Sequence, residues 1–194
     1  MPERDPHSHA ASGVVRPVAL YGHPVLSRAC RPVTVFDDEL GRLVVDMFAT
    51  MYAAEGVGLA ANQIGVDARV FVVDCPDASG RHTVAHVVNP VLEEATDREL
   101  VTEPEGCLSV PGAYGDLARL ATVAVQGVDR HGDPVRLVGT GLLARCFQHE
   151  VAPRRDRLRR PAVATRAVAA ARGGPAAGLS DARAAVSGRP GAMR

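Results

Sequence analysis

Apolar side chains recur at helical spacing in two stretches, and each stretch predicts a buried helix. The first begins after Asp37 or Asp38, either of which can cap a helix, and ends at Glu55 and Gly56, where glycine permits the turn. Its apolar stripe consists of Leu40, Leu43, Val44, Met47, Phe48 and Met51. The second stretch is residues 139–150, GTGLLARCFQHE. Its apolar positions are Leu142, Leu143, Cys146 and Phe147.

β-Branched residues between these helices predict a hairpin. Residues 70–74, VFVVD, and residues 83–88 read as strands joined by the turn-rich sequence PDASGR. Residues 87–92 continue the second strand until Pro90, which cannot donate a ladder hydrogen bond, limits the pairing.

A second strand pair is predicted further along the chain. Residues 121–128 and 134–138 alternate around a turn at 129–133, in which His131 is a turn residue. The acidic residues from 93 to 105 are expected to form an exposed connection. Together the patterns predict an α+β protein with short, mostly antiparallel strands.

Composition fits one soluble domain but separates the chain into two unequal parts. The 194 residues are 46% hydrophobic, and every one of the 22 basic residues is arginine. Residues 1–150 carry 12 Arg and 20 acidic residues, a net charge of −8, whereas residues 151–194 carry 10 Arg and 2 Asp, a net charge of +8. A basic tail is compatible with nucleic-acid binding, but its composition has another explanation given below, and we expect no direct nucleic-acid partner.

The sequence also predicts the domain boundaries and the cellular compartment of the protein. Residues 1–13 lack the apolar core of a signal peptide and are expected to be disordered, residues 14–151 to form the domain, and residues 152–194 to be a poorly ordered tail. No apolar run reaches the length of a membrane span, so no membrane association is expected. The four cysteines show no close pairing, which suits a reducing cytoplasm and a cytoplasmic protein.

Three short motifs carry candidate chemistry, although each is weak when taken alone. Residues 56–65, GVGLAANQIG, could be a structural glycine-rich turn, and Cys107 in EGCLSV could be a buried structural cysteine. QHE at 148–150 is half of the H-E-x-x-H metal motif, but the position four residues after His149 is Pro153, which cannot bind a metal.

In order and spacing, however, the three motifs resemble those of the peptide deformylases, and the resemblance runs from Val14 to Val151. These enzymes use a divalent metal to remove the formyl group from the initiator methionine of new bacterial proteins. The resemblance implies short sheets wrapped around a central helix that carries the His-Glu motif. It also implies Cys107 and His149 as metal ligands, with Fe(II) as the expected metal and Zn or Ni as alternatives.

The resemblance further implies the roles of residues around the metal. Glu150 takes a proton from the metal-bound water and passes it to the leaving amine, while Gln63 and the backbone N–H of Leu108 hold the developing oxyanion. Gly58 pairs its backbone with the peptide. The other substrate-binding residues expected are Val57, Leu59 and Gly106. Partners are nascent formyl-methionyl peptides at the ribosome, and the protein is expected to be a monomer.

The third motif departs from the family pattern Q-H-E-x-D-H-L-x-G directly after Glu150. Pro153 removes the second histidine ligand and, in a helix, its ring would clash with the carbonyl of His149. Codons for residues 152–160, read one base later, can encode His-Leu-Asp-Gly-Thr-Val-Tyr-Ala-Asp, which resembles the family's continuation. A frameshift, biological or from sequencing, therefore explains the arginine-rich tail.

Three interpretations remain open from the sequence: a deformylase impaired by weak metal binding, a non-catalytic formyl-peptide-binding relic, and a non-functional product of the frameshift. If the family resemblance assigns these residues correctly, the side chains of Gln63, Cys107, His149 and Glu150 should converge in one pocket. The tail is expected to be loosely attached, with a helical piece at residues 162–172.

Overall fold

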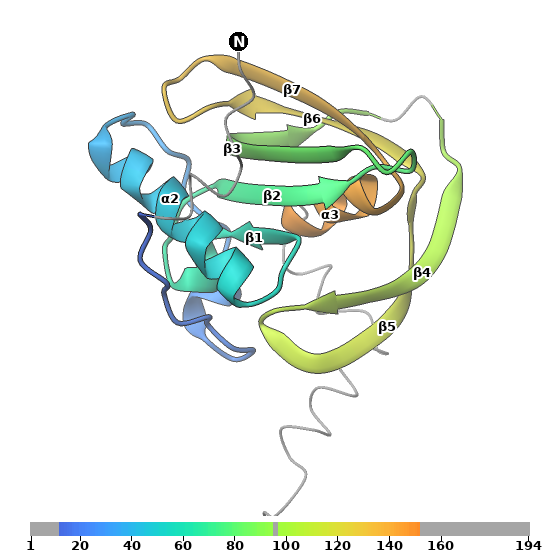
Figure 1. The fold of residues 1–194 in the computed structure, drawn as a ribbon, viewed down its shortest axis with the longest axis horizontal. Coiled ribbons are helices and arrows are strands. Elements are labelled where there is room, and N and C mark those ends of the chain that lie inside the picture. The colour runs from blue at the N-terminus through green and yellow to red at the C-terminus, as the bar shows by residue number, and fades with distance from the viewer. Residues whose placement is uncertain (1–11, 95–96, 152–194) are drawn as a thin grey trace, which may run out of the picture.

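The computed structural model describes residues 12–94 and 97–151, which form two helices and two antiparallel sheets (Figure 1). The larger sheet has the strand order β1-β2-β3-β6-β7, and the smaller one pairs β4 with β5. In chain order the elements are η1 (Pro24–Leu26), α2 (Asp38–Ala53), β1 (Gly58–Ala60), η2 (Ala61–Ile64), β2 (Val70–Pro76), β3 (His82–Leu92), β4 (Leu100–Cys107), β5 (Val110–Leu120), β6 (Thr122–Val128), β7 (Pro134–Thr140) and α3 (Gly141–Val151).

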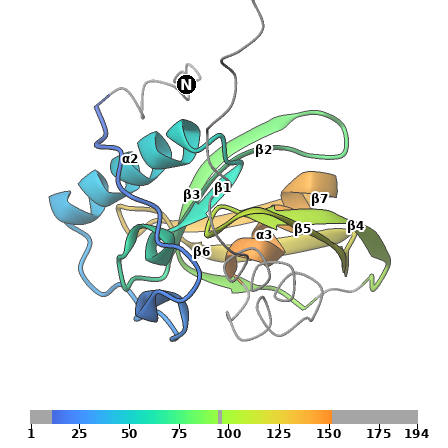
Figure 2. The ribbon, with the colours of Figure 1, turned by 90° about the horizontal axis from the view of Figure 1, so that it is seen from below.

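Helices α2 and α3 cover opposite faces of the five-stranded sheet (Figure 2). Strand β2 shows why: Val70 and Val72 belong to the apolar cluster beneath α2, whereas Phe71 and Val73 belong to the cluster that contains α3. Because side chains alternate along a strand, a strand that is buried on both faces is apolar throughout. The run VFVV therefore marks the centre of the molecule.

Helix α2 forms as its pattern predicts, with one correction at its end. Asp37 is the N-cap, and its carboxylate accepts hydrogen bonds from the N–H groups of Glu39 and Leu40 at 3.0 and 3.1 Å. All six residues of the predicted stripe are buried. The prediction that glycine permits the terminal turn was wrong, because the positive φ of 54° belongs to Glu55. Gly56 instead provides room: a Cβ there would lie 2.8 Å from Leu108 Cδ1.

The β-hairpins at 70–92 and 122–140 are confirmed, but the prediction of an exposed connection over residues 93–105 was wrong from Leu100 onward. Strand β4 starts there and pairs with β5, with a register shift between Gly106 and Cys107. Most of β4 is exposed, so it lacks the apolar alternation by which the other strands were found.

Helix α3 lies between the two sheets and completes the α+β arrangement that was predicted. Leu143 and Phe147 pack into the core of the larger sheet. On the other side, the Gln148 side chain bonds the backbone N–H and C=O of Leu120 in β5, at 3.0 and 2.9 Å. Short antiparallel sheets therefore do wrap the helix that carries His149 and Glu150. Among the described residues, neither helix is long and apolar enough to cross a membrane.

Several predictions concern residues outside the described ranges. These are the disorder expected at the N-terminus up to residue 11, the tail at 152–194 with its helical piece at 162–172, and Pro153. Gly13, in contrast, lies against α2, where an added Cβ would be 2.5 Å from the carbonyl oxygen of Val45.

The segment after Gly13 is fastened to α2 by Asp46, which gives a first prediction. The Asp46 carboxylate accepts hydrogen bonds from Val14 N at 2.8 Å and from Arg16 Nε at 2.9 Å. Burial raises the pKa of Asp46, but these donors outweigh it and leave the pKa below its ordinary 3.8. We expect Asp46→Asn to lower the free energy of unfolding by about 1–3 kcal/mol at pH 7. Urea unfolding monitored by circular dichroism measures the change.

The pH dependence of this loss has a definite sign. A carboxyl with a lowered pKa in the folded state contributes stability above its unfolded pKa, and this stability disappears as pH falls through the folded pKa. The difference between the two proteins should therefore shrink below pH 3.8. Asp116→Asn, at an exposed position of β5, is the control and should change stability by less than about 0.5 kcal/mol. An equal loss at pH 7 and pH 3 would contradict the role assigned to the charge of Asp46.

Candidate active site

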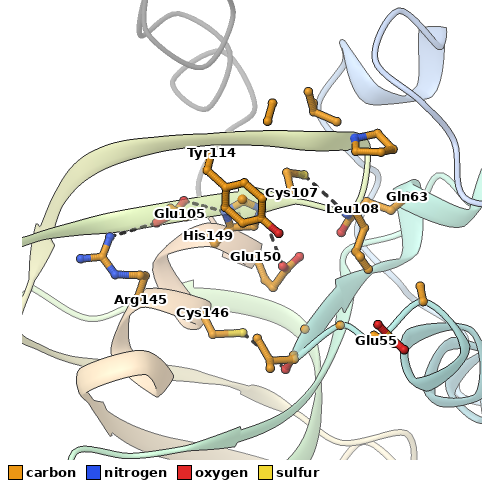
Figure 3. A pocket seen from close by; sticks show the side chains of 18 of the residues that line it. Glu55, Gln63, Glu105, Cys107, Leu108, Tyr114, Arg145, Cys146, His149 and Glu150 are labelled. Carbon is orange, nitrogen blue, oxygen red and sulfur yellow. Dashed lines mark hydrogen bonds and ion pairs between the residues drawn. The ribbon is translucent and has the colours of Figure 1, made fainter. Parts of the chain in front are cut away.

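A cavity of about 470 Å³ opens between the β1–η2 segment, the β4–β5 hairpin and α3 (Figure 3). Its volume is in the range of small-molecule and peptide sites. Eight of the nine predicted site residues line it: Val57, Gly58, Gln63, Gly106, Cys107, Leu108, His149 and Glu150. The ninth, Leu59, does not, because its side chain is fully buried in the cluster beneath α2.

Gln63 is held in a single orientation by η2. Its side chain is buried, and its Oε1 accepts a hydrogen bond from the N–H of Ala60 at 2.8 Å. With the carbonyl used in this way, the NH₂ group is directed to Cys107, with Nε2 3.7 Å from Sγ. A neutral donor is therefore fixed inside the cavity, next to the thiol.

Cys107 ends β4 at the register shift, which places its thiol in the cavity. Burial raises the pKa of this thiol, but a hydrogen bond from His149 and the charge of that ring outweigh it, so the pKa is lowered overall. A lowered pKa favours the thiolate, which is the form that binds a metal.

His149 is oriented by a carboxylate that the sequence interpretation did not single out. Its Nδ1 lies 2.6 Å from Glu105 Oε1, and Arg119 holds the same carboxylate through Nε and Nη2 at 3.0 and 2.6 Å. If Nδ1 carries the proton, as a carboxylate partner favours, the other ring nitrogen is available to the cavity. Glu105 is the first residue of the EGCLSV motif, so its position could have marked it as a site residue. Nothing in the sequence pointed to Arg119.

Glu150 lies beside His149 on the last turn of α3, with Oε1 4.0 Å from His149 Nε2 and a side chain that is only 4% exposed. Gly58 makes this possible. A Cβ on Gly58 would lie 2.5 Å from Cys146 Sγ and 3.3 Å from Glu150 Oε1. The β1 backbone can therefore approach α3 only because residue 58 is glycine.

Tyr114 is a further cavity residue that was not predicted. Its ring lies over Gly106, where an added Cβ would be 2.7 Å from the ring carbon Cε1. The side chain is largely exposed, and it leaves the cavity with an aromatic wall on the β5 side. Gly106 thus contributes space for this ring.

A catalytic metal site commonly uses three protein ligands, and the described residues place two of the expected donors, Cys107 and His149, in the cavity. Cys107 provides a thiolate and His149 an imidazole, both suited to a divalent metal. Within residues 12–94 and 97–151, no group of three or more His, Cys, Asp or Glu side chains could hold a metal ion. The next candidate position in the sequence is Pro153, which lies outside the described residues and has no donor side chain. The described residues therefore do not by themselves fit a complete site.

The Glu105 network gives a second prediction. Burial raises the pKa of Glu105, but the hydrogen bonds from His149 and Arg119 lower it from 4.5 to about 2. At 1.36 kcal/mol per pKa unit, this shift corresponds to roughly 3 kcal/mol of stability at pH 7. We expect Glu105→Gln to lose about 2–3 kcal/mol in urea unfolding at pH 7.

Because the folded pKa is the lower one, this contribution is complete above pH 4.5 and is lost as pH falls toward about 2. Glu99→Gln, at an exposed position before β4, is the matched control and should be neutral. If Glu105→Gln were as stable as the parent at pH 7, the ion network would contribute nothing.

Comparison with known proteins gives a consistent result for the part of the chain that contains this cavity. The model of the family described as polypeptide deformylase matches residues 15–152. Peptide deformylase 2 of Streptomyces avermitilis is 58% identical over 138 residues, which are 71% of this chain and 74% of the relative. Peptide deformylase 1 of Corynebacterium efficiens is 50% identical over 70% of this chain and 79% of the relative.

Solved structures show the same similarity. A peptide deformylase from Synechococcus elongatus in complex with actinonin has a TM-score of 0.64 at 39% identity, covering 71% of this chain and 76% of that one. A Met-Ala-Ser-bound peptide deformylase from Acinetobacter baumannii has a TM-score of 0.65 at 35% identity, covering 72% and 92%.

Proposed function

The chain belongs to the polypeptide deformylase family, and we propose that its cavity binds formyl-methionyl peptide ends but deformylates them poorly. Members of this family are metal-dependent hydrolases that remove the N-formyl group from formyl-methionyl peptides. The observation that carries the proposal is the convergence of Gln63, Cys107, His149 and Glu150 on one cavity, in which the described residues hold no group of three or more metal-binding side chains.

The residues present support recognition of the formyl group and of the peptide backbone. The NH₂ group of Gln63 and the backbone N–H of Leu108 are the donors we assign to the formyl oxygen as it becomes an oxyanion. Glu150, enclosed beside His149, is assigned the proton transfers to and from the reacting groups. Val57, Gly58 and Gly106 border the peptide, whereas Leu59, which is buried in the core and does not line the cavity, is given no contact with it.

Metal binding is the step at which we place the impairment. Cys107 and His149 are the ligands, the metal is Fe(II), with Zn or Ni as alternatives, and the position of the third ligand is taken by Pro153. A bound metal would supply an activated water to the cavity. Two protein ligands in place of three lower the affinity for metal, because each ligand contributes to the binding free energy.

The partners follow from the same proposal. The substrate is a nascent peptide that begins with formyl-methionine. The protein acts on it at the ribosome, as a monomer in the cytoplasm. The arginines of residues 151–194 are not assigned to nucleic acid, since a shifted reading frame accounts for them.

A second candidate function is non-catalytic binding of formyl peptides. It is favoured by the Gln63 amide, whose carbonyl oxygen is held in place by the backbone N–H of Ala60. The two candidates differ in metal content: the impaired enzyme retains some metal together with slow turnover, and the binding relic retains neither. A non-functional frameshifted product would lack peptide binding as well.

The test makes three measurements on one preparation. Mass spectrometry gives the metal content, an activity assay gives the release of formate from a formyl-methionyl peptide, and calorimetry gives the binding of that peptide. We expect substoichiometric metal, formate release far below that of an intact deformylase, and detectable peptide binding. Stoichiometric metal with rapid turnover would refute the impairment, and absence of peptide binding would refute both candidate functions.

A further inference from the structure

The β4–β5 hairpin, which carries Cys107, has few partners of its own. Among the described strands it forms a sheet of only two, and such a hairpin is marginally stable in isolation. Its contacts with α3 therefore contribute to where Cys107 lies relative to His149 and Glu150.

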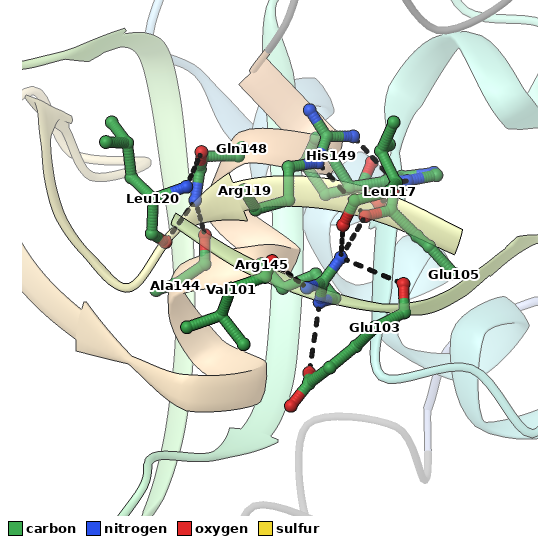
Figure 4. Close-up of polar contacts among 11 residues, drawn as sticks. Val101, Glu103, Glu105, Leu117, Arg119, Leu120, Ala144, Arg145, Gln148 and His149 are labelled. Carbon is green, nitrogen blue, oxygen red and sulfur yellow. Dashed lines mark hydrogen bonds and ion pairs between the residues drawn. The ribbon is translucent and has the colours of Figure 1, made fainter. Parts of the chain in front are cut away.

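One α3 side chain contacts both strands of this hairpin. Arg145 Nη2 donates to the carbonyl of Val101 in β4 at 3.0 Å, and Nη1 donates to the carbonyl of Leu117 in β5 at 2.9 Å (Figure 4). The Arg145 side chain is only 6% exposed, so both bonds are shielded from bulk water. The fork of the guanidinium group spans the two strands in a way that a single ammonium cannot.

The same guanidinium also reaches the carboxylate that orients His149. Arg145 Nη1 lies 3.3 Å from Glu105 Oε2, while Glu105 Oε1 lies 2.6 Å from His149 Nδ1. Arg145 and His149 are four residues apart on α3 and therefore share one face of the helix. Both bind Glu105, so the carboxylate is held from α3 at two points.

We propose that Arg145 is a positioning residue: it fixes the β4–β5 hairpin on α3 and thereby sets the relative placement of Cys107 and His149. It does not touch the reacting groups itself. Cys107 is two residues beyond Glu105 on β4, so a displacement of the hairpin moves the carboxylate and the thiol together. Only the peptide-binding part of the test below rests on the proposed function.

The test compares Arg145→Met, Arg145→Lys and the control Arg136→Met in the full chain. Arg136 pairs with Glu93 through two bonds on the surface of β7, and its side chain is 59% exposed, so its loss should change little. Hydrogen exchange is measured for the amides of β4–β5 and of α2. The bond between the His149 ring and Glu105 is followed by the ¹⁵N and ¹H resonances of the labelled imidazole.

In Arg145→Met we expect exchange in β4–β5 to accelerate by about tenfold or more, while α2 stays within about twofold of the parent. The His149 resonances should lose the signature of the carboxylate bond, and affinity for a formyl-methionyl peptide should fall by about 10- to 100-fold. Arg145→Lys should recover part of each effect because it keeps the charge without the fork.

Uniform acceleration over α2 and β4–β5 would show a general loss of stability and would overturn the proposal. Unchanged exchange in both regions would overturn it as well. If the parent chain binds no peptide, the proposed function fails, yet the exchange and imidazole measurements still decide the role of Arg145.

Discussion

Rewriting residues 152–160 in the shifted frame, with Asp and His restored ahead of the Leu, should recover metal binding and formate release together. The described site already presents the Cys107 thiol, the oriented His149 ring and the enclosed Glu150 carboxylate in one cavity. A third ligand would complete the set on which both metal affinity and the acidity of a bound water depend. We expect formate release to rise by at least about 100-fold, since a lost catalytic component commonly costs 10²–10⁴ in rate.

Pro153→His alone is the matched comparison for this rewriting. It restores a donor at the right spacing but leaves out the rest of the shifted-frame sequence, so we expect little recovery. Formate release and metal content are measured on the same samples of all three proteins. Equal turnover by the unmodified and rewritten chains would mean that another group, such as His131 or a residue of the tail, completes the site.

Most of the fold could be predicted because the larger sheet and its helices follow hydrophobic periodicity closely. The residues of the run Val70–Val73 and of the apolar stripe of α2 are all buried in the structure, as their sequence pattern predicts. Strand β4 escaped prediction because Leu100 and Val101 are exposed, so that its sequence reads as an acidic loop. Its pairing is specified instead by β5, the next strand of the hairpin, and by α3, which is distant in sequence.

The residues of the candidate site also fall into those that the sequence could predict and those that it could not. Residues within contiguous motifs, such as Gln63, Cys107 and His149, could be singled out from the sequence and are found together in the cavity. Arg119 and Arg145 could not, because an isolated arginine has no local signature of burial. Their significance arises only when β5 and α3 bring them to Glu105. The positive φ at Glu55, next to a glycine that does not need one, is missed for a similar reason.

Glu150→Gln, introduced into the rewritten chain, should abolish most of the recovered formate release while leaving metal content and stability near those of the rewritten parent. Glutamine keeps the size of the side chain but cannot accept and return a proton at neutral pH, which is the role assigned to this carboxylate. The side chain is only 4% exposed and lies beside His149, and a Cβ on Gly58 would lie 3.3 Å from its Oε1, so it is closely enclosed in the cavity. We expect kcat to fall by about 10²–10⁴-fold with KM changed by less than about threefold.

Glu39→Gln, in the exposed first turn of α2, controls for the loss of one negative charge. A Glu150→Gln protein that retained a tenth or more of the turnover would assign the proton transfer to a different group.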